Sequence, residues 1–395
     1  MTPVENVEFL IKKYFCKDVN IKDKTISNNC IGALARKNEF IDFTDNFEKR
    51  LERLSKNVTD EEQRKEIIEK IKNLAEKTDY KWSGPYSELV ALDFFINSGF
   101  IADFKFVNKV NTVDYPNSIA ARINRKTIDI DFSFSLEGEQ YFTDIKSLIP
   151  TQNELLDVII NNVQEKLNIK GILIGVDEVS PILIFDLQKV IDDEKKCIEE
   201  KILEAIKNKQ NRISYTTKNK VTYNFNISYD GFLSVSKVSN PYTLANFDKY
   251  KYFNYLDKLL DSEYSLLTFV INPWFNNEQK SFCNFSRTYY RSVCRRIFIE
   301  FKNDNTPLSQ YQYFEYIKNK SITFSDVSTS IAGLLFIEDN SIKKLPKNSL
   351  YNGYLYLNPN YKNKTPLSRC NFYSYLDNPP ISKIIEIDDF LDDNY

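Results

Sequence analysis

The sequence predicts a mixed α/β protein in which a helical N-terminal region precedes a core built on a mixed β-sheet flanked by helices, followed by an α/β C-terminal half. Residues 1–82 show helical periodicity and many charges, whereas the pattern after residue 100 changes to the period-two alternation of strands. We therefore place the helical region at 1–82, the core at 83–190 and the C-terminal region at 191–395. The strand-like runs of the last region either extend the same sheet or form a second domain.

Two absences in the composition exclude several kinds of chemistry. The 395 residues include no histidine and only nine glycines. Without histidine, a serine or cysteine nucleophile activated by histidine is excluded, and so is a zinc ion held by histidine. The glycine patterns of phosphate-binding loops and of dinucleotide-binding domains are also missing, which argues against P-loop ATP hydrolysis and NAD chemistry. Carboxylates, lysines, arginines, hydroxyls and thiols remain as candidates.

The apolar segments and the cysteines indicate a soluble, cytoplasmic protein with no membrane partner. No apolar run reaches the roughly 18 to 20 residues needed to span a bilayer, and the acidic start of the chain does not fit a signal peptide. The six cysteines are scattered without C-x-x-C spacing. That distribution favours free thiols in a reducing compartment over a disulfide framework or a zinc site.

The N-terminal region contains two helix starts that the sequence marks clearly. Thr59 begins a stretch with the spacing of a capping box, and the helix that follows is expected to end near Lys77. Pro85 suits the first turn of the next helix, and Gly99 suits its end. The apolar stripe of this second helix is formed by Leu89, Leu92, Phe95 and Ile96.

The core is expected to contain a β-hairpin. Strict alternation of apolar and polar residues predicts a strand at 127–136, and residues 140–148 are its natural antiparallel partner. The other elements expected in the core are a strand at 101–107, a helix at 151–167, and short buried strands at 171–176 and 181–186.

The pairing of this hairpin decides which charged side chains are neighbours. We take Gly138 and Glu139 as a two-residue loop, because glycine suits the first central position of a type II′ turn. Asp131 then falls opposite Lys146, and Asp144 lies one step further along the same face. A loop of three residues would turn one strand over and separate these side chains.

Two neighbouring carboxylates and a lysine are groups that metal-assisted phosphodiester hydrolysis uses. Asp131 and Asp144 repel each other when forced together, so a divalent cation or another positive charge is expected beside them. Such a cation binds a phosphate oxygen and a water, while Lys146 orients or deprotonates that water and offsets negative charge at the phosphorus. The alternative is a solvated hairpin face with an ordinary ion pair between Asp131 and Lys146.

These residues resemble the motif of the PD-(D/E)XK nuclease superfamily, which has the restriction-endonuclease-like fold. The resemblance rests on Asp131-Phe132 on one strand and Asp144-Ile145-Lys146-Ser147 on the next, thirteen residues further on. Glu88, on the preceding helix, matches the acidic residue that many members carry there. The match covers roughly residues 83 to 190. No proline precedes Asp131, and an aspartate stands where glutamate is commoner in the family.

The resemblance implies the role of each residue in the motif. Asp131 and Asp144 would hold Mg²⁺ or Mn²⁺, and Lys146 would act on the attacking water. The backbone carbonyl of Ile145 and the carboxylate of Glu88 would be further metal ligands. The implied protein is a metal-dependent endonuclease, a phosphodiester hydrolase of restriction or phage defence, for which DNA is preferred over RNA as substrate.

Three other functions stay open at this stage. One is a nuclease-fold protein that binds nucleic acid or a protein partner without cutting, and another is an RNA-cleaving enzyme with the same site. The third is a structural or interaction protein whose hairpin face is incidental. A homodimer would suit cutting of both DNA strands.

A row of arginines in the C-terminal half is a candidate for binding phosphates. The net charge is −2, so nucleic-acid binding requires a local basic face. Arg287, Arg291 and Arg295 are spaced by four residues on a helix expected at 281–302, and such a row can grip a phosphate backbone. The same row equally fits a charged outer face paired with acids. The apolar stripe of this helix is formed by Phe282, Phe285, Tyr289, Val293 and Ile297.

Overall fold

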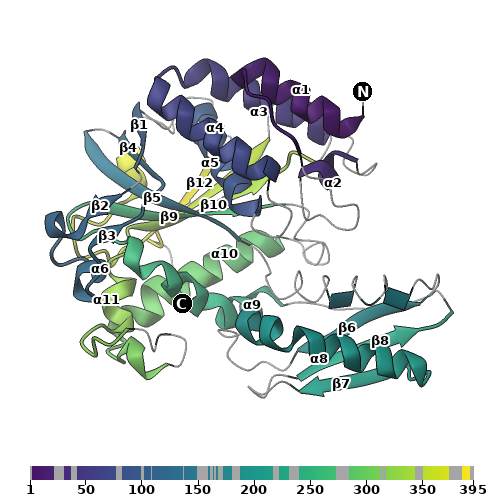
Figure 1. Ribbon diagram of the computed structural model, residues 1–395. Coiled ribbons are helices and arrows are strands. Elements are labelled where there is room, and N and C mark those ends of the chain that lie inside the picture. Colours follow the sequence, from purple (N-terminus) through teal and green to yellow (C-terminus); the bar gives the residue numbers. More distant parts are fainter. Residues whose placement is uncertain are drawn as a thin grey trace. The chain divides into compact units, whose positions relative to one another are not determined.

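The chain folds into two compact units in the computed structural model (Figure 1). The large unit comprises Met1–Leu148, Tyr252–Asn276 and Tyr290–Tyr395, and the small unit comprises Ile149–Lys251 and Asn277–Tyr289. These units do not follow the expected boundaries at residues 82 and 190, because the helical region and the hairpin belong to one unit. The structure describes residues 2–21, 31–36, 42–76, 82–98, 102–107, 109–136, 138–148, 159–160, 163, 166–167, 172–179, 187–216, 222–230, 240–272, 284–311, 314, 317–342, 350–372 and 385–391.

A mixed β-sheet forms the centre of the large unit. Among the described residues it has seven strands in the order β1-β4-β5-β9-β10-β11-β12. The strands β5, β9 and β10 run parallel, whereas β1, β4 and β5 form an antiparallel meander. The C-terminal half therefore extends the same sheet. The bounds are β1 (Ala102–Phe106), β4 (Phe132–Leu136), β5 (Glu139–Ser147), β9 (Tyr264–Ile271), β10 (Gly333–Asp339), β11 (Tyr351–Leu357) and β12 (Ile385–Asp388).

The N-terminal region is helical, as expected. The helix predicted from the capping pattern is confirmed as α4, although the capping side chain is that of Asp60, which accepts a 2.9 Å hydrogen bond from the Gln63 N–H. Such a cap satisfies one of the free N–H groups of the first turn. The helices of this region are α1 (Pro3–Phe15), α2 (Ile31–Arg36), α3 (Phe43–Asn57), α4 (Glu61–Glu76) and α5 (Ser83–Ser98).

The helix α5 is central to the large unit. It packs against α3 and α4 on one side and against β5, β9 and β10 on the other. Its expected stripe is buried except for Ile96, which is half-buried. Tyr86, Val90 and Phe94 on other faces are fully buried as well. A helix that is apolar on all sides is typical of such a position between two layers. Polar groups on α5 therefore need partners from the elements around it.

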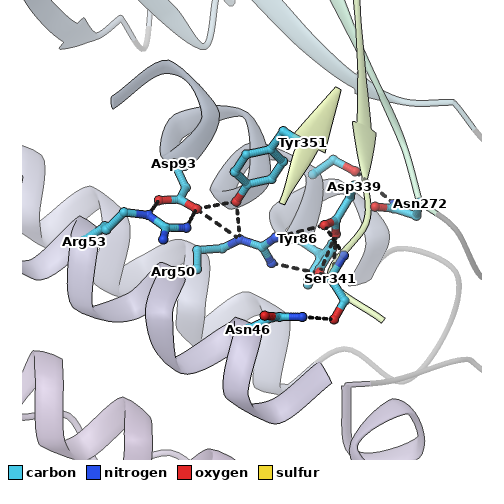
Figure 2. Close-up of polar contacts among 10 residues, drawn as sticks. Asn46, Arg50, Arg53, Tyr86, Asp93, Asn272, Asp339, Ser341 and Tyr351 are labelled. Carbon is cyan, nitrogen blue, oxygen red and sulfur yellow. Dashed lines mark hydrogen bonds and ion pairs between the residues drawn. The ribbon is translucent and has the colours of Figure 1, made fainter. Parts of the chain in front are cut away.

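A buried polar network joins the N-terminal helices to the sheet, as Figure 2 shows. The fully buried Arg50 of α3 donates hydrogen bonds to the hydroxyls of Tyr351 and Tyr86, at 3.0 and 2.8 Å. Its third hydrogen bond, at 3.1 Å, goes to Oδ1 of Asp339 at the end of β10. The other oxygen, Oδ2, accepts from the hydroxyls of Tyr86 and Ser341, at 2.7 and 3.0 Å.

A second arginine completes this network. Arg53 donates hydrogen bonds of 2.7 and 2.5 Å to the two carboxylate oxygens of Asp93, which lies on α5. The Tyr351 hydroxyl also donates to Asp93, and Arg50 lies 3.7 Å from the same carboxylate. Two arginines thus balance two aspartates. We call the following set the arginine network: Arg50, Arg53, Tyr86, Asp93, Asp339, Ser341 and Tyr351.

The strand expected at 127–136 is interrupted. Thr127–Ile128 forms β3, which pairs with β2 (Val110–Asn111) in a separate two-stranded sheet, and β4 begins only at Phe132. The side chains of Ile128 and Ile130 pack in a small cluster of their own, whereas Phe132 belongs to the main core. One alternating pattern therefore serves two cores, and Asp131 lies in the break.

The hairpin exists, but the predicted pairing was wrong. Leu136 pairs with Glu139, so the two loop residues are 137 and 138. Gly138 has φ +86° at the second loop position, a conformation that glycine adopts without strain and that type I′ hairpins require there. Continuing this register by one residue beyond the last pair places Asp131 opposite Asp144 instead of Lys146. The shift of two residues keeps every side chain on its expected face.

The small unit contains an antiparallel sheet in the order β6-β8-β7. The strand expected at 171–176 is present as β6 (Leu173–Val179), but it lies in this separate sheet and not beside β5. The position beside β5 is taken by β9. The strand expected at 181–186 lies outside the described residues, as does most of the helix expected at 151–167. The other elements of this unit include β7 (Arg212–Thr216), β8 (Thr222–Ser228), α8 (Leu187–Lys207) and α9 (Pro241–Asp248).

The helix expected at 281–302 is present over most of its length. It consists of α10 (Phe285–Arg295), a π-helical turn at Arg296–Glu300 and a 3₁₀ turn at Phe301–Asn303. Within the part of the chain that the structure describes, no helix is long and apolar enough to cross a bilayer. The remaining elements used below are α6 (Ile119–Arg122), the 3₁₀ segment η5 (Lys249–Lys258) and α11 (Phe324–Ser328).

Candidate functional site

The predicted acidic residues of the hairpin lie together at the start of β4 and near the end of β5. The carboxylate of Asp131 accepts a 2.7 Å hydrogen bond from the backbone N–H of Ile145. The backbone carbonyl of Asp131 accepts from the Val107 N–H, at 3.1 Å. Because both its side chain and its backbone are bound, Asp131 is fixed beside β5 although it lies outside the regular strand.

Asp144 is the most buried acid of this cluster, with 2% of its surface exposed. Its Oδ2 lies 2.5 Å from Nζ of Lys146, and its Oδ1 lies 3.7 Å from Nζ of Lys258 on η5. Burial raises the pKa of the Asp144 carboxyl to about 7, and the nearby charge of Asp131 adds to this effect, whereas the two lysines oppose it. Asp144 therefore changes charge near neutral pH.

Lys146 keeps its positive charge in this setting. Burial alone would lower the pKa of Lys146, but the carboxylates of Asp144 and Asp131 outweigh burial and raise it. Its Nζ lies 5.4 Å from the centre of the Tyr255 ring, within the range of a cation–π contact. An ammonium held in this way can stabilise negative charge and orient a water, but it is a poor base.

Glu88 of α5 pairs with a lysine that the sequence did not single out. Its carboxylate forms an ion pair with Lys70 of α4. Burial raises the pKa of the Glu88 carboxyl, Lys70 opposes this rise, and the negative charge of Asp131 adds to it. Glu88 is therefore within electrostatic reach of Asp131. The carboxylate–lysine site, as we call it, comprises Lys70, Glu88, Asp131, Asp144, Lys146 and Lys258.

Asn272, at the end of β9, links the elements that carry this site. Its amide nitrogen lies 3.2 Å from the Ser87 hydroxyl and 3.3 Å from that of Ser147, which are the chain neighbours of Glu88 and Lys146. Asn272 is fully buried and is labelled in Figure 2. These bonds tie α5, β5 and β9 together beside the charged groups, so Asn272 is a positioning residue.

The donor chemistry of the site partly fits a divalent cation. Carboxylates and the Ile145 carbonyl are hard oxygen ligands of the kind that Mg²⁺ and Mn²⁺ prefer. Oδ2 of Asp144 is buried and lies 2.5 Å from the ammonium of Lys146, so a cation bound there would compete with that lysine. As they stand, however, the described residues contain no group of three or more acidic, cysteine or histidine side chains that could hold a metal ion. Asp131 and Asp144 offer oxygens to a cation, while Asp144 and Glu88 are each paired with a lysine, Lys146 and Lys70 respectively.

Arg291 and Arg295 of the arginine row on α10 pair with acids. Arg291 donates a 2.6 Å hydrogen bond to Asp388, and Arg295 lies 3.6 Å from Glu300. The expected apolar stripe is buried from Phe285 onward, and Phe282 lies outside the described residues. Phosphate binding by Arg287, Arg291 and Arg295 stays a prediction.

Sequence reasoning missed Lys70, Tyr255, Lys258 and Asn272. None of them belongs to a motif, and each comes from a segment far from the hairpin in the sequence. Comparisons of the chain with protein-family models, with curated proteins and with solved structures gave no match. The geometry of the carboxylate–lysine site and the resemblance of its motif are therefore the two observations that bear on function.

Proposed function

We propose that the large unit is a metal-dependent nuclease with the restriction-endonuclease-like fold that hydrolyses phosphodiester bonds in DNA. The observation that carries this proposal is the hairpin geometry. It puts Asp131 opposite Asp144, whose carboxylate lies 2.5 Å from the ammonium of Lys146. The order of elements supports it too. The helix α5, the strand β1 and the hairpin β4–β5 follow the expected order, whereas the strand parallel to β5 is β9 and not the strand expected at 171–176.

The site residues have distinct roles in this proposal. Asp131, Asp144 and the Ile145 carbonyl would hold the divalent cation, with Glu88 as a further ligand once its ion pair with Lys70 opens. The cation would supply Lewis-acid activation of a phosphate oxygen and of a water. Lys146 stabilises the negative charge that grows on the phosphate and orients the attacking water, because its ammonium stays charged. Burial of Asp144 strengthens these interactions, since water screens them less.

A second candidate is a nucleic-acid-binding protein with the same fold that does not cut. One observation favours it: the lysines Lys70 and Lys146 already pair with Glu88 and Asp144. Lysines that pair with these acids take the place of the cation that hydrolysis needs. The same lysines carry the positive charge that attracts a phosphate backbone, which would then bind without being cut. The two candidates differ in whether the nucleic acid is shortened.

The decisive experiment is a cleavage assay on plasmid DNA, single-stranded DNA and RNA, with Mg²⁺, with Mn²⁺ and with EDTA. We compare the wild type with Lys146→Met, which keeps the length of the side chain but removes its charge. Lys362→Met is the matched control, because Lys362 pairs with Asp326 elsewhere in the large unit. We expect metal-dependent cutting that falls about 100- to 1,000-fold in Lys146→Met and not in the control.

Two results would contradict the proposal. Cutting by the wild type that Lys146→Met retains in full would place the active site elsewhere. No cutting of any substrate by the wild type, together with binding of DNA or RNA in a gel-shift assay, would favour the non-cutting candidate. Preferential cutting of RNA would keep the site and change the substrate.

A further inference from the structure

Lys70 forms an ion pair with Glu88, which is one of the carboxylates that the cation site would use. We propose that Lys70 is an internal counter-ion that competes with the divalent cation for Glu88, so that the helix α4 lowers the metal affinity of the site. This inference rests on the proposed function. It concerns a residue outside the motif, contributed by the N-terminal helical region.

Lys70 is held in place from several sides. Its ammonium lies 5.5 Å from the centre of the Phe106 ring and 6.0 Å from that of Phe132, in addition to its ion pair with Glu88. Only 18% of its side chain is exposed. Lys72 on the same helix is different, because 44% of its side chain is exposed and its partner Glu69 is 4.0 Å away. The position of Lys70 is therefore specific to the site.

When Asp144 is ionised, the charges of the site balance without a metal ion. Three acids, Glu88, Asp131 and Asp144, stand against the three lysines of the site. A divalent cation at Glu88 would meet the ammonium of Lys70 at the same carboxylate, and this repulsion is strong where water screens poorly. Lys70 has a long side chain whose end can turn to solvent, so metal binding can displace it. Displacing Lys70 lowers the affinity of the site for the cation.

The inference is tested by calorimetric titration with Mn²⁺ alone, without nucleic acid. Lys70→Met keeps the apolar stem against Phe106 and Phe132 but removes the charge, and Lys72→Met is the matched control on the same helix. We expect the dissociation constant for Mn²⁺ to fall about tenfold or more in Lys70→Met and to stay unchanged in the control. In a Glu88→Gln background the Lys70→Met gain should disappear, because the competition is for that carboxylate.

A purely structural role for Lys70 predicts other results. Thermal unfolding in EDTA shows whether Lys70→Met is folded, and Lys70→Gln, which keeps a hydrogen-bond donor, is the second variant if it is not. A folded variant that binds Mn²⁺ no more tightly than the wild type overturns this inference, while the proposed function stands if Lys146-dependent cutting persists. Absence of both Mn²⁺ binding and cutting in every variant overturns both.

Discussion

The helix α5 contributes residues to two clusters of buried charge, and the two clusters are built differently. The arginine network balances two arginines with two aspartates, and the carboxylate–lysine site balances three lysines with three acids. In the arginine network the guanidinium of Arg50 makes three hydrogen bonds, and both oxygens of Asp339 accept hydrogen bonds. In the carboxylate–lysine site, the two oxygens of Asp144 lie 2.5 and 3.7 Å from the ammonium groups of Lys146 and Lys258.

The difference shows that charge balance alone does not tell a structural cluster from a functional one. Arg50 is fully buried, and its planar guanidinium fits its partners in one geometry. Lys146 is 26% exposed, and its flexible ammonium can exchange one partner for another. The arginine network thus has the properties of a permanent junction. The carboxylate–lysine site has those of a place where a cation or phosphate can replace an internal partner.

The largest effect is expected from removing one cation of each cluster. Arg50→Leu should lower the free energy of unfolding by about 3–5 kcal/mol, because it leaves Asp339 buried without its cation. Lys146→Met should cost less than about 1 kcal/mol, because Asp144 can take up a proton. Urea denaturation of both variants at neutral pH, in EDTA, measures this contrast. Equal losses would remove the distinction between the clusters.

The pH dependence of stability sharpens the comparison further. Asp144 has a pKa of about 7 in the folded protein, above the value of about 3.9 for an unfolded chain. Its contribution to stability is therefore fully present below pH 4 and is lost as the pH rises through 7. Relative to Asp144→Asn, the wild type should lose on the order of 4 kcal/mol over this range, because each pKa unit corresponds to about 1.4 kcal/mol.

This second prediction is checked by urea denaturation from pH 4 to 8 in EDTA. The comparison with Asp144→Asn cancels the titration of other groups, since both proteins share them. Curves that stay parallel over the whole range would mean that Asp144 has an ordinary pKa. A raised pKa at Asp144 would then no longer distinguish the site from the arginine network.

The smallest effect is expected at Lys258, which lies at the edge of the site. Its ammonium donates to the backbone carbonyl of Asp129 and lies 3.7 Å from Asp144. Lys258→Met should cost about 1 kcal/mol, the value of one hydrogen bond, and should move the Asp144 transition to higher pH. The same denaturation series measures both quantities. A transition that moves to lower pH would contradict the assigned contact.

Much of the site could be predicted from local patterns. Strand periodicity placed Asp144 and Lys146 on one face of a hairpin strand, and the helix that carries Glu88 followed from its proline and its apolar residues. The predicted pairing of the hairpin strands was wrong by two residues. We expected Gly138 at the first position of the loop, whereas it lies at the second. The break before Phe132 was missed because alternation continues through it while the side chains pack in two different cores.

The sequence by itself determined the elements, since periodicity and turn chemistry act between residues a few positions apart. Only the tertiary structure decided that β9 lies beside β5, that Lys70 and Lys258 face the acids, and that Arg50 joins α3 to the end of β10. These contacts join segments far apart in the chain. They depend on how whole layers pack, which no local pattern records.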